Sequence, residues 1–240
     1  MAYRIDPDLE FLAKLTSEEL KPLVHVLVYD KDNKKRLTEQ ITSNDKYKQF
    51  QPDHSKYWDI IAEEIQRFGG NTFINILRAG KGVLYREILM NVCDKAKVNY
   101  NKKSSIEQIE SNLLQKIFLD AVEKMNTEEL KTIVTELNLE TTNFTPQAVV
   151  AALQLALRNS VFLLGDVVVI IFQSMIARMI TAGGIVFTGN IIGARLLAAF
   201  TGPIGWAITG LWTAFDIAGP AYRVTVPAVI MTACLRQMHK

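Results

Sequence analysis

The sequence predicts an all-α protein: a multi-helix N-terminal domain followed by an apolar, glycine-rich helical hairpin region. Helix start signals recur along residues 1–145, where no alternating run is bounded by hairpin turns. The charge then falls sharply, because 8 of the 95 residues in 146–240 are charged, against 44 of 145 before them. We therefore predict a charged, soluble helical domain at 1–145. An apolar helical region, membrane-associated or buried, follows at 146–240.

The first helices are predicted from their capping residues. Asp6, directly followed by a proline, is typical of an N-cap before a proline at the first helical position. Thr16 and Glu19 form a capping box that opens a helix extending through Val28. Pro22 lies inside this second helix and should kink it or delay its start.

A polar stretch and an amphipathic helix come next. Residues 30–56 are polar and broken, and we expect a short helix at Lys34–Ile41 followed by a loop. Four apolar residues then recur at the spacing of one helix face. They are Trp58, Ile61, Ile65 and Phe68. The Gly69-Gly70 pair should end this helix as a C-cap.

Four further helices are predicted before the charge falls. The first is short, and after a glycine-containing turn the second covers residues 83–97. Capping pairs open the other two, Ser104 with Glu107 and Asn126 with Glu129. The N-terminal domain is thus expected to consist of short, well-capped helices.

The region after Pro146 is predicted to form longer, more apolar helices. Residues 148–157 are apolar on most sides, and residues 161–180 are almost continuously hydrophobic. We expect 161–180 to be helical, since this apolar stretch is too long for one strand. Residues 196–215 contain no charge, and twenty apolar residues match the hydrocarbon thickness of a bilayer.

Small residues in the apolar region are candidate packing or membrane sites. Gly189 and Gly193 are four positions apart, a spacing that lets two helix backbones approach closely in lipid. The alternative is that these glycines make a loop flexible. Gly202 and Pro203 lie within 196–215, where they either kink a spanning helix or turn a shallow hairpin.

Aromatic and basic residues of the same region fit a membrane interface. Trp206 and Trp212 are candidate interface residues, because tryptophan is enriched at headgroup level. Arg178 and Arg195 flank a short uncharged stretch, from which their side chains can extend to lipid headgroups. Alternatively, the tryptophans belong to a large core, and the arginines lie on the surface of a soluble fold.

Asp166 is the one charge singled out for a functional role. It lies in the apolar stretch 161–171, where a carboxylate is costly unless it is paired or hydrated. Gln173 is seven residues further on, nearly on the same helical face, so the two side chains would line a polar path. Alternatively, Asp166 caps a helix broken at Gly165, or pairs with an arginine such as Arg158.

No motif predicts catalysis. The three histidines, His25, His54 and His239, have no ligand-like spacing, and the two cysteines form no CxxC. Residues 78–82 lack the frame of a phosphate loop and a preceding strand, so a basic turn is expected there. A net charge of +2 does not favour a nucleic-acid partner. We expect no enzymatic activity, no cofactor and no metal.

The sequence resembles the bacterial YaaW family from end to end. The resemblance is closest in the C-terminal run Ala-Tyr-Arg-Val-Thr-Val-Pro-Ala-Val-Ile. The stretches that carry it are 8–12, 18–20, 68–70, 77–78, 80–81, 84–89, 221–230 and 233–236. That family is grouped distantly with chaperones for assembly of the cytochrome b subunit of the ubiquinol–cytochrome c complex. The resemblance implies an all-helical binding domain for an apolar client, and it brings no catalytic residue.

The leading hypothesis is a non-enzymatic, membrane-associated helical protein that is chaperone-like or assists assembly. Its partner would be membrane lipid or an apolar protein client, and a homo-oligomer is compatible with this hypothesis. It would be cytoplasmic and associated with the inner membrane, with a transmembrane helix or a shallow insertion at 160–218. The alternative is a soluble helical protein whose buried hydrophobic hairpin inserts in membranes conditionally, as pore-forming or toxin-like proteins do.

Overall fold

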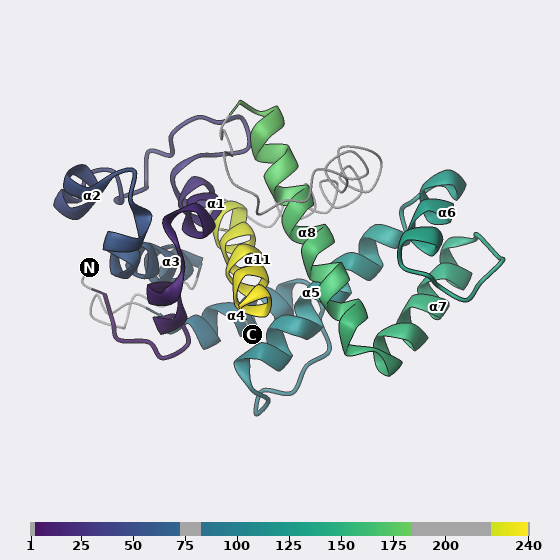
Figure 1. Cartoon of the computed structure of the whole chain (residues 1–240). Coiled ribbons are helices and arrows are strands. Elements are labelled where there is room, and N and C mark those ends of the chain that lie inside the picture. Colours follow the sequence, from purple (N-terminus) through teal and green to yellow (C-terminus); the bar gives the residue numbers. More distant parts are fainter. Residues whose placement is uncertain (1–2, 73–82, 184–221, 240) are drawn as a thin grey trace.

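The computed structural model describes residues 3–72, 83–183 and 222–239, and the named secondary-structure elements of this part of the chain are all helices, joined by turns and loops (Figure 1). The all-α prediction is confirmed. The elements are η1 (Glu10–Lys14), α1 (Ser17–Val28), α2 (Asp45–Phe50), η2 (His54–Tyr57), α3 (Trp58–Thr72), α4 (Tyr85–Lys95), α5 (Ile106–Val122), α6 (Thr127–Glu136), α7 (Pro146–Asn159), α8 (Val161–Thr181) and α11 (Tyr222–Met238). The predicted glycine-rich hairpin falls mostly in 184–221, outside the described residues.

Two predicted capping boxes are confirmed. The Thr16 side chain accepts a hydrogen bond from the backbone of Glu19, whose carboxylate accepts one from the backbone of Thr16 in return. Asn126 and Glu129 cap α6 in the same reciprocal way. The cap of α5 is Ser105, one residue later than predicted. Each box satisfies backbone N–H groups that the first helical turn leaves without partners.

Two predictions in the first sixty residues are wrong. Residues 34–41 form no helix, and the helix of this stretch is α2, capped by Asn44. The Asp30 carboxylate holds the preceding turn by accepting from the backbone N–H of Lys34 at 2.8 Å. Asp6 begins no α-helix after its proline, because a turn and η1 follow. Its carboxylate instead accepts from the backbone N–H of Tyr85 at 2.7 Å, at the start of α4.

The glycine pair does not end α3, which continues to Thr72. Gly69 lies where α3 crosses α4, and a Cβ atom there would overlap the side chain of Ile88. At Gly70 the nearest neighbour of an added Cβ would be Val83, at an ordinary 3.6 Å. Gly69 therefore permits a close helix crossing and does not serve as a helix stop.

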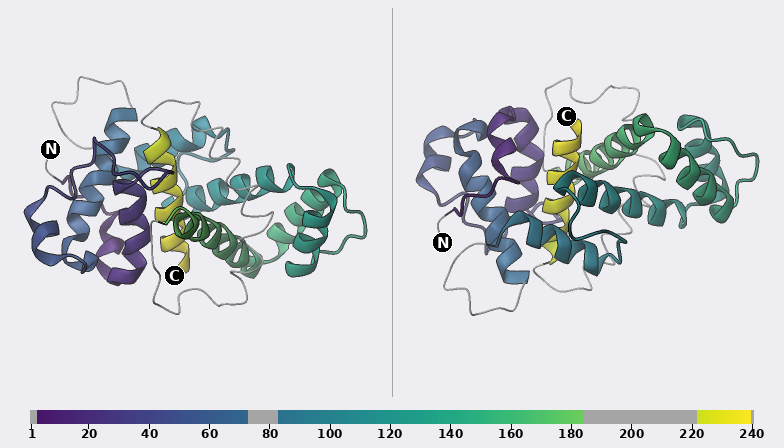
Figure 2. Two further views of the ribbon diagram at one scale, coloured as in Figure 1. Left: turned by 90° about the horizontal axis from the view of Figure 1, so that it is seen from above. Right: turned by 90° about the horizontal axis from the view of Figure 1, so that it is seen from below.

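Helix α11 forms the centre of the described body. It packs against α1, α3, α4, α5 and α8, and its residues from Val224 to Leu235 are buried apart from the half-buried Pro227 (Figures 1 and 2). The hydrophobic core that it completes draws on both sides of residue 145. The predicted division into 1–145 and 146–240 stays a prediction, but helices from both ranges share one core.

Helix α8 lies across α11 and also packs against α5 and α7 (Figure 2). Its β-branched run 167–171 is helical, as predicted. Among the described residues, Phe162–Thr181 is the one helix long and apolar enough to cross a membrane, and 67% of that window is buried in the fold. In this structure α8 is a core helix.

Candidate functional site

One pocket opens where the C-terminal ends of α1 and α8 meet the N-terminal end of α11. It holds about 690 Å³ of empty space, measured out to its open side. Its walls come from Ala182 at the end of α8 and Tyr222 at the start of α11, with the loop after α1. Segments far apart in the sequence therefore meet at this place.

The floor of the pocket is apolar. Met175 and Met179 lie one helical turn apart on α8, and both are buried. Val26 of α1 and Pro227 of α11 complete the floor. Methionine side chains are unbranched and adapt to irregular apolar partners. The floor can therefore accommodate flexible hydrocarbon.

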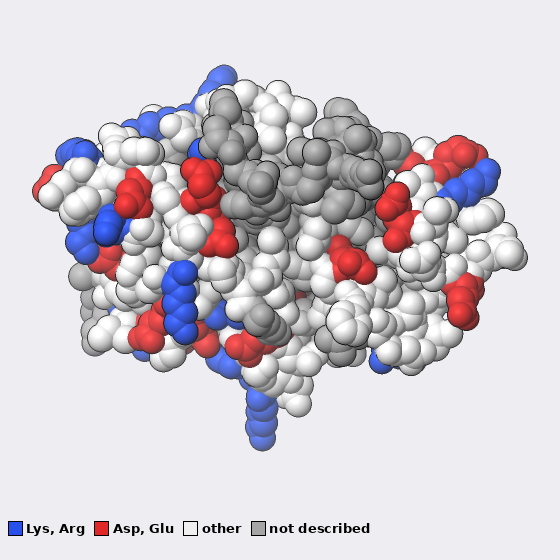
Figure 3. Space-filling view, viewed as in Figure 1, with Lys and Arg blue, Asp and Glu red and all other residues white. Residues whose placement is uncertain are grey.

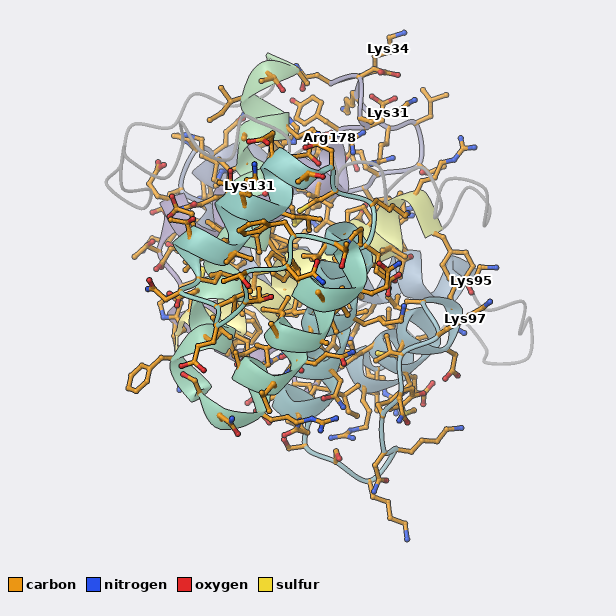
Figure 4. All side chains as sticks on the ribbon, turned by 90° about the vertical axis from the view of Figure 1, so that its right-hand side faces the viewer. Lys31, Lys34, Lys95, Lys97, Lys131 and Arg178 are labelled. Carbon is orange, nitrogen blue, oxygen red and sulfur yellow. The ribbon has the colours of Figure 1, made fainter. Side chains whose placement is uncertain are left out.

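Four basic side chains also line the pocket. Lys31 and Arg36 come from the loop after α1, Arg178 from α8 and Arg223 from α11. Figure 4 shows Lys31 and Arg178 at the upper end of the molecule, and Figure 3 shows basic side chains along the same edge, over the loop after α1. Among the described residues that line the pocket, the one acidic residue is Asp30. The pocket is therefore cationic around an apolar floor.

The carboxylate of Asp30 is engaged by its own loop. Its Oδ1 accepts hydrogen bonds from the backbone N–H groups of Asp32 at 3.0 Å and Lys34 at 2.8 Å. Arg36 donates from Nε to the carbonyl of Val26 at 3.3 Å, which fixes the base of its side chain. These contacts shape the loop and hold its two cations beside α8.

His25 lines the pocket as a neutral side chain. Burial lowers its pKa, Arg36 lowers it further, and a hydrogen bond to Asn33 opposes both effects. The His25 Nε2 and Asn33 Oδ1 atoms are 3.1 Å apart, and Tyr29 packs against the imidazole ring with centroids 5.0 Å apart. The positive charge of the pocket at neutral pH therefore comes from its lysine and arginines.

Tyr222 fixes the start of α11 beside the pocket. Its hydroxyl donates to Asn91 Oδ1 of α4 at 2.7 Å, and the Lys95 ammonium lies 5.5 Å from its ring centroid. Lys95 and Lys97 lie together on one side of the molecule in Figure 4. The wall that Tyr222 contributes is thus anchored to the helical body.

A buried polar cluster holds the other end of α11. Arg236 donates from Nε to both carboxylate oxygens of Glu110, and its Nη2 donates to the carbonyl of Asp8. The Tyr85 hydroxyl donates to Glu110 Oε1 at 2.8 Å. Burial raises the pKa of Glu110 to about 7, although Arg236 and Tyr85 act in the opposite direction. The cluster joins α11 to α4, α5 and the N-terminal segment.

Asp166, the one predicted site residue that the structure describes, is exposed on α8. The helix continues through Gly165, so the alternative in which Asp166 caps a helix broken there is wrong. No ion pair joins it to Arg158, which is likewise among the described residues. Gln173 is buried, so the two side chains differ in their surroundings. A role for Asp166 in a polar path stays a prediction.

The remaining predicted site residues lie outside the described residues. They are Gly189, Gly193, Gly202, Pro203, Trp206 and Trp212. Sequence reasoning noted Arg178 but did not connect it with Lys31, Arg36 or Arg223. One signal was present, since Arg178 and Arg223 are two of only six basic residues after residue 145. Their convergence with the loop after α1 leaves no local pattern in the sequence.

The described helical body corresponds largely to one family model. The ubiquinol-cytochrome C chaperone family matches residues 53–230, and a domain of unknown function (DUF3944) matches residues 3–37. The chain belongs to the ubiquinol-cytochrome C chaperone family and to the UPF0174 family of its curated relatives. The resemblance to the YaaW family is thereby confirmed.

The relatives are similar over nearly their whole length. A UPF0174 protein of Helicobacter pylori strain J99 is 47% identical over 98% of this chain and 93% of its own. A UPF0174 protein of H. pylori strain 26695 is 37% identical over 83% of this chain and 97% of its own. The UPF0174 protein YaaW of Escherichia coli K12 is 31% identical over 98% and 96%. No solved structure matches the chain.

Proposed function

We propose that this protein is a non-catalytic, membrane-associated chaperone that assists the assembly of an apolar client at the cytoplasmic face of the inner membrane. The family description supports the chaperone part of this proposal. Its partners would be membrane lipid and an apolar protein segment. A homo-oligomer of this chain is compatible with either partner.

The observation that carries the membrane part is that the end of α8 and the start of α11 meet beside basic side chains. Helix α8 ends and α11 begins at the same cationic pocket. The 38 residues between them, 184–221, contain only two charged residues, Arg195 and Asp216. An apolar sequence thus joins two helix ends that are surrounded by lysine and arginine. Basic residues beside an apolar sequence favour an anionic membrane surface.

A second candidate function is conditional insertion from a soluble state. The burial of α8 favours it, because the most apolar described helix is already covered by protein. Insertion of α8 would require the contacts with α5 and α11 to open. In the leading proposal α8 stays in the body, and only 184–221 enters lipid.

The full-length chain tests the proposal by flotation with liposomes, followed by carbonate extraction of the floated fraction. The comparison variant replaces 184–221 with a Gly/Ser linker of equal length, so that both helix ends keep their spacing. A truncation at 145 is unsuitable, because it removes α8 and the central α11. Circular dichroism and thermal unfolding report whether the variant keeps its helical body.

We expect the full chain to float and to resist carbonate, while the folded linker variant remains in the soluble fraction. Full-length protein that stays soluble with liposomes would contradict membrane association. If full chain and linker variant both float and resist carbonate, another part of the protein is the anchor. If α8 becomes accessible to a membrane-confined reagent, the conditional mechanism is favoured.

A further inference from the structure

We infer that the pocket between α1, α8 and α11 is a binding site for the phosphate headgroup of an anionic phospholipid. The inference rests on the proposed function, because it names the lipid that the membrane-associated protein would select. The phosphate would lie among Lys31, Arg36, Arg178 and Arg223. The glycerol backbone and the first methylenes of an acyl chain would contact the apolar floor.

The distribution of charge in the pocket argues for an anionic ligand. Its four basic residues come from three separate elements, and the fold brings them together around one opening. Among the described lining residues, the one carboxylate is that of Asp30, whose Oδ1 accepts hydrogen bonds from the backbone of its own loop. Arginine forms paired hydrogen bonds with phosphate oxygens, so three arginines beside a lysine are suited to this group.

The apolar floor argues for a lipid over free phosphate. The side chains of Met175, Met179 and Pro227 in the floor have no hydrogen-bond donor for a small anion. They provide instead a surface for hydrocarbon directly behind the cations. An amphiphile with one phosphate and two short chains presents the same order of chemistry, charge first and apolar carbon next. Inorganic phosphate could contact the basic side chains but would leave the apolar floor without a partner.

The pocket's position suits a ligand that belongs to a membrane. Ala182 and Tyr222, at the two ends of the apolar sequence 184–221, are both lining residues. A headgroup bound here would lie beside the described residues that flank that sequence on both sides. Selection of lipid and anchoring of the chain would then occur on the same face.

Isothermal titration of the full-length protein with monomeric short-chain lipid tests the inference without a bilayer. The lipid probes are dihexanoyl phosphatidylglycerol, dihexanoyl phosphatidylcholine and dibutanoyl phosphatidylglycerol, each used below its micelle-forming concentration. Inorganic phosphate is the fourth probe. We expect the first to bind at least tenfold more tightly than the choline lipid and than phosphate. Dibutanoyl phosphatidylglycerol should bind more weakly than dihexanoyl phosphatidylglycerol, by about fourfold for each methylene that no longer reaches the floor.

The double variant Arg178→Gln/Arg223→Gln should weaken binding of dihexanoyl phosphatidylglycerol at least tenfold. The matched control is Arg158→Gln/Lys131→Gln, which removes the same charge from exposed positions on α7 and α6. The control should bind as the unmodified chain does. Thermal unfolding of both variants establishes that the helical body is retained.

Three results would overturn the inference. They are equal affinity for dihexanoyl phosphatidylglycerol and dihexanoyl phosphatidylcholine, binding of inorganic phosphate as tight as that of dihexanoyl phosphatidylglycerol, or equal losses of lipid affinity in the two double variants. These outcomes are separate from failure of the proposed function. A protein that does not float with liposomes but binds the monomeric anionic lipid selectively retains this site and loses its membrane anchor. A protein that floats but shows no selectivity retains the anchor and loses this site.

Discussion

Arg236, in the last turn of α11, donates from Nε to both carboxylate oxygens of Glu110, at 3.1 and 2.9 Å. Glu110 is fully buried on α5, and the Arg236 guanidinium lies 4.0 Å from the ring centroid of Phe11. This pair joins residues 126 positions apart. It therefore fixes how the C-terminal helix is seated among helices formed much earlier in the chain.

The first prediction concerns this pair. Arg236→Met removes the cation and leaves a buried carboxylate, so we expect a loss of about 3–5 kcal/mol in unfolding free energy at pH 8. Glu110→Gln/Arg236→Met should lose less, because neither member then carries a charge. Urea denaturation of the three proteins measures both effects. A double variant no more stable than Arg236→Met would show that packing, and not charge, is decisive.

The same pair predicts a dependence on pH. Burial raises the pKa of Glu110 above its ordinary value of 4.5, to about 7, so the folded state binds the extra proton between these values. Its contribution to stability is therefore present on the acid side and lost as pH rises through 7. Without Arg236, less opposes the effect of burial, so the pKa of Glu110 rises further. The cost of Arg236→Met should accordingly be smaller at pH 5 than at pH 8, and a larger cost at pH 5 would contradict this assignment.

The helix crossing at Gly69 predicts opposite effects for neighbouring glycines. Gly69→Ala places a methyl group within the side chain of Ile88 and should cost about 1–3 kcal/mol. Gly70→Ala has an ordinary contact with Val83 and should stabilise α3 by about 0.5–1 kcal/mol through helix propensity. Thermal unfolding of the two variants gives the comparison. Equal effects would mean that α3 and α4 do not cross closely at Gly69.

The cap that Asp6 provides to α4 gives a further test. Asp6→Ala leaves the buried N–H of Tyr85 without its 2.7 Å acceptor and should destabilise the fold by about 1–3 kcal/mol. Asp8→Ala is the matched control, because its carboxylate is partly exposed and 3.9 Å from Arg86. We expect the control to cost less than about 1 kcal/mol. Chemical denaturation that ranks the two variants in the reverse order would contradict the capping role.

His25 predicts a loss of stability in acid. Its pKa is lowered from 6.5 by burial and by Arg36, so the unfolded chain takes up a proton before the folded one does. The resulting stability is present above pH 6.5 and is lost as pH falls toward the folded pKa. His25→Gln should reduce the slope of unfolding free energy against pH between 7 and 5. An unchanged slope would place the acid sensitivity at other groups.

Local patterns in the sequence predict much of the helical fold. Thr16, Asn126 and the apolar stripe from Trp58 to Phe68 can each be recognised from the residues of one helix, and each is confirmed. The errors occur where long-range contacts decide the structure. Asp6 caps a helix 79 residues away, and Gly69 is needed for the approach of Ile88. No local rule distinguishes these residues from a helix start and a helix stop.

The candidate site was predictable in part. The scarcity of charge after residue 145 drew attention to Arg178, and its possible contact with headgroups was inferred from sequence. Lys31 and Arg36 gave no such signal, because they lie in a polar loop with many charged neighbours. Their place in the pocket depends on how the end of α8 packs beside α1 and α11.

The most direct test of the central claim is to measure which face of the protein contacts the bilayer. A fluorophore is attached at Asp32→Cys, in the loop beside the pocket, or at Lys103→Cys, in the loop between α4 and α5 at the opposite, lower edge in Figure 1. Cys93 and Cys234 are buried, and burial raises the pKa of the Cys93 thiol to about 12, which disfavours labelling there. With anionic vesicles that carry a headgroup-attached quencher, the account predicts strong quenching at position 32 and little at position 103. Equal quenching at both positions, or stronger quenching at 103, would contradict it.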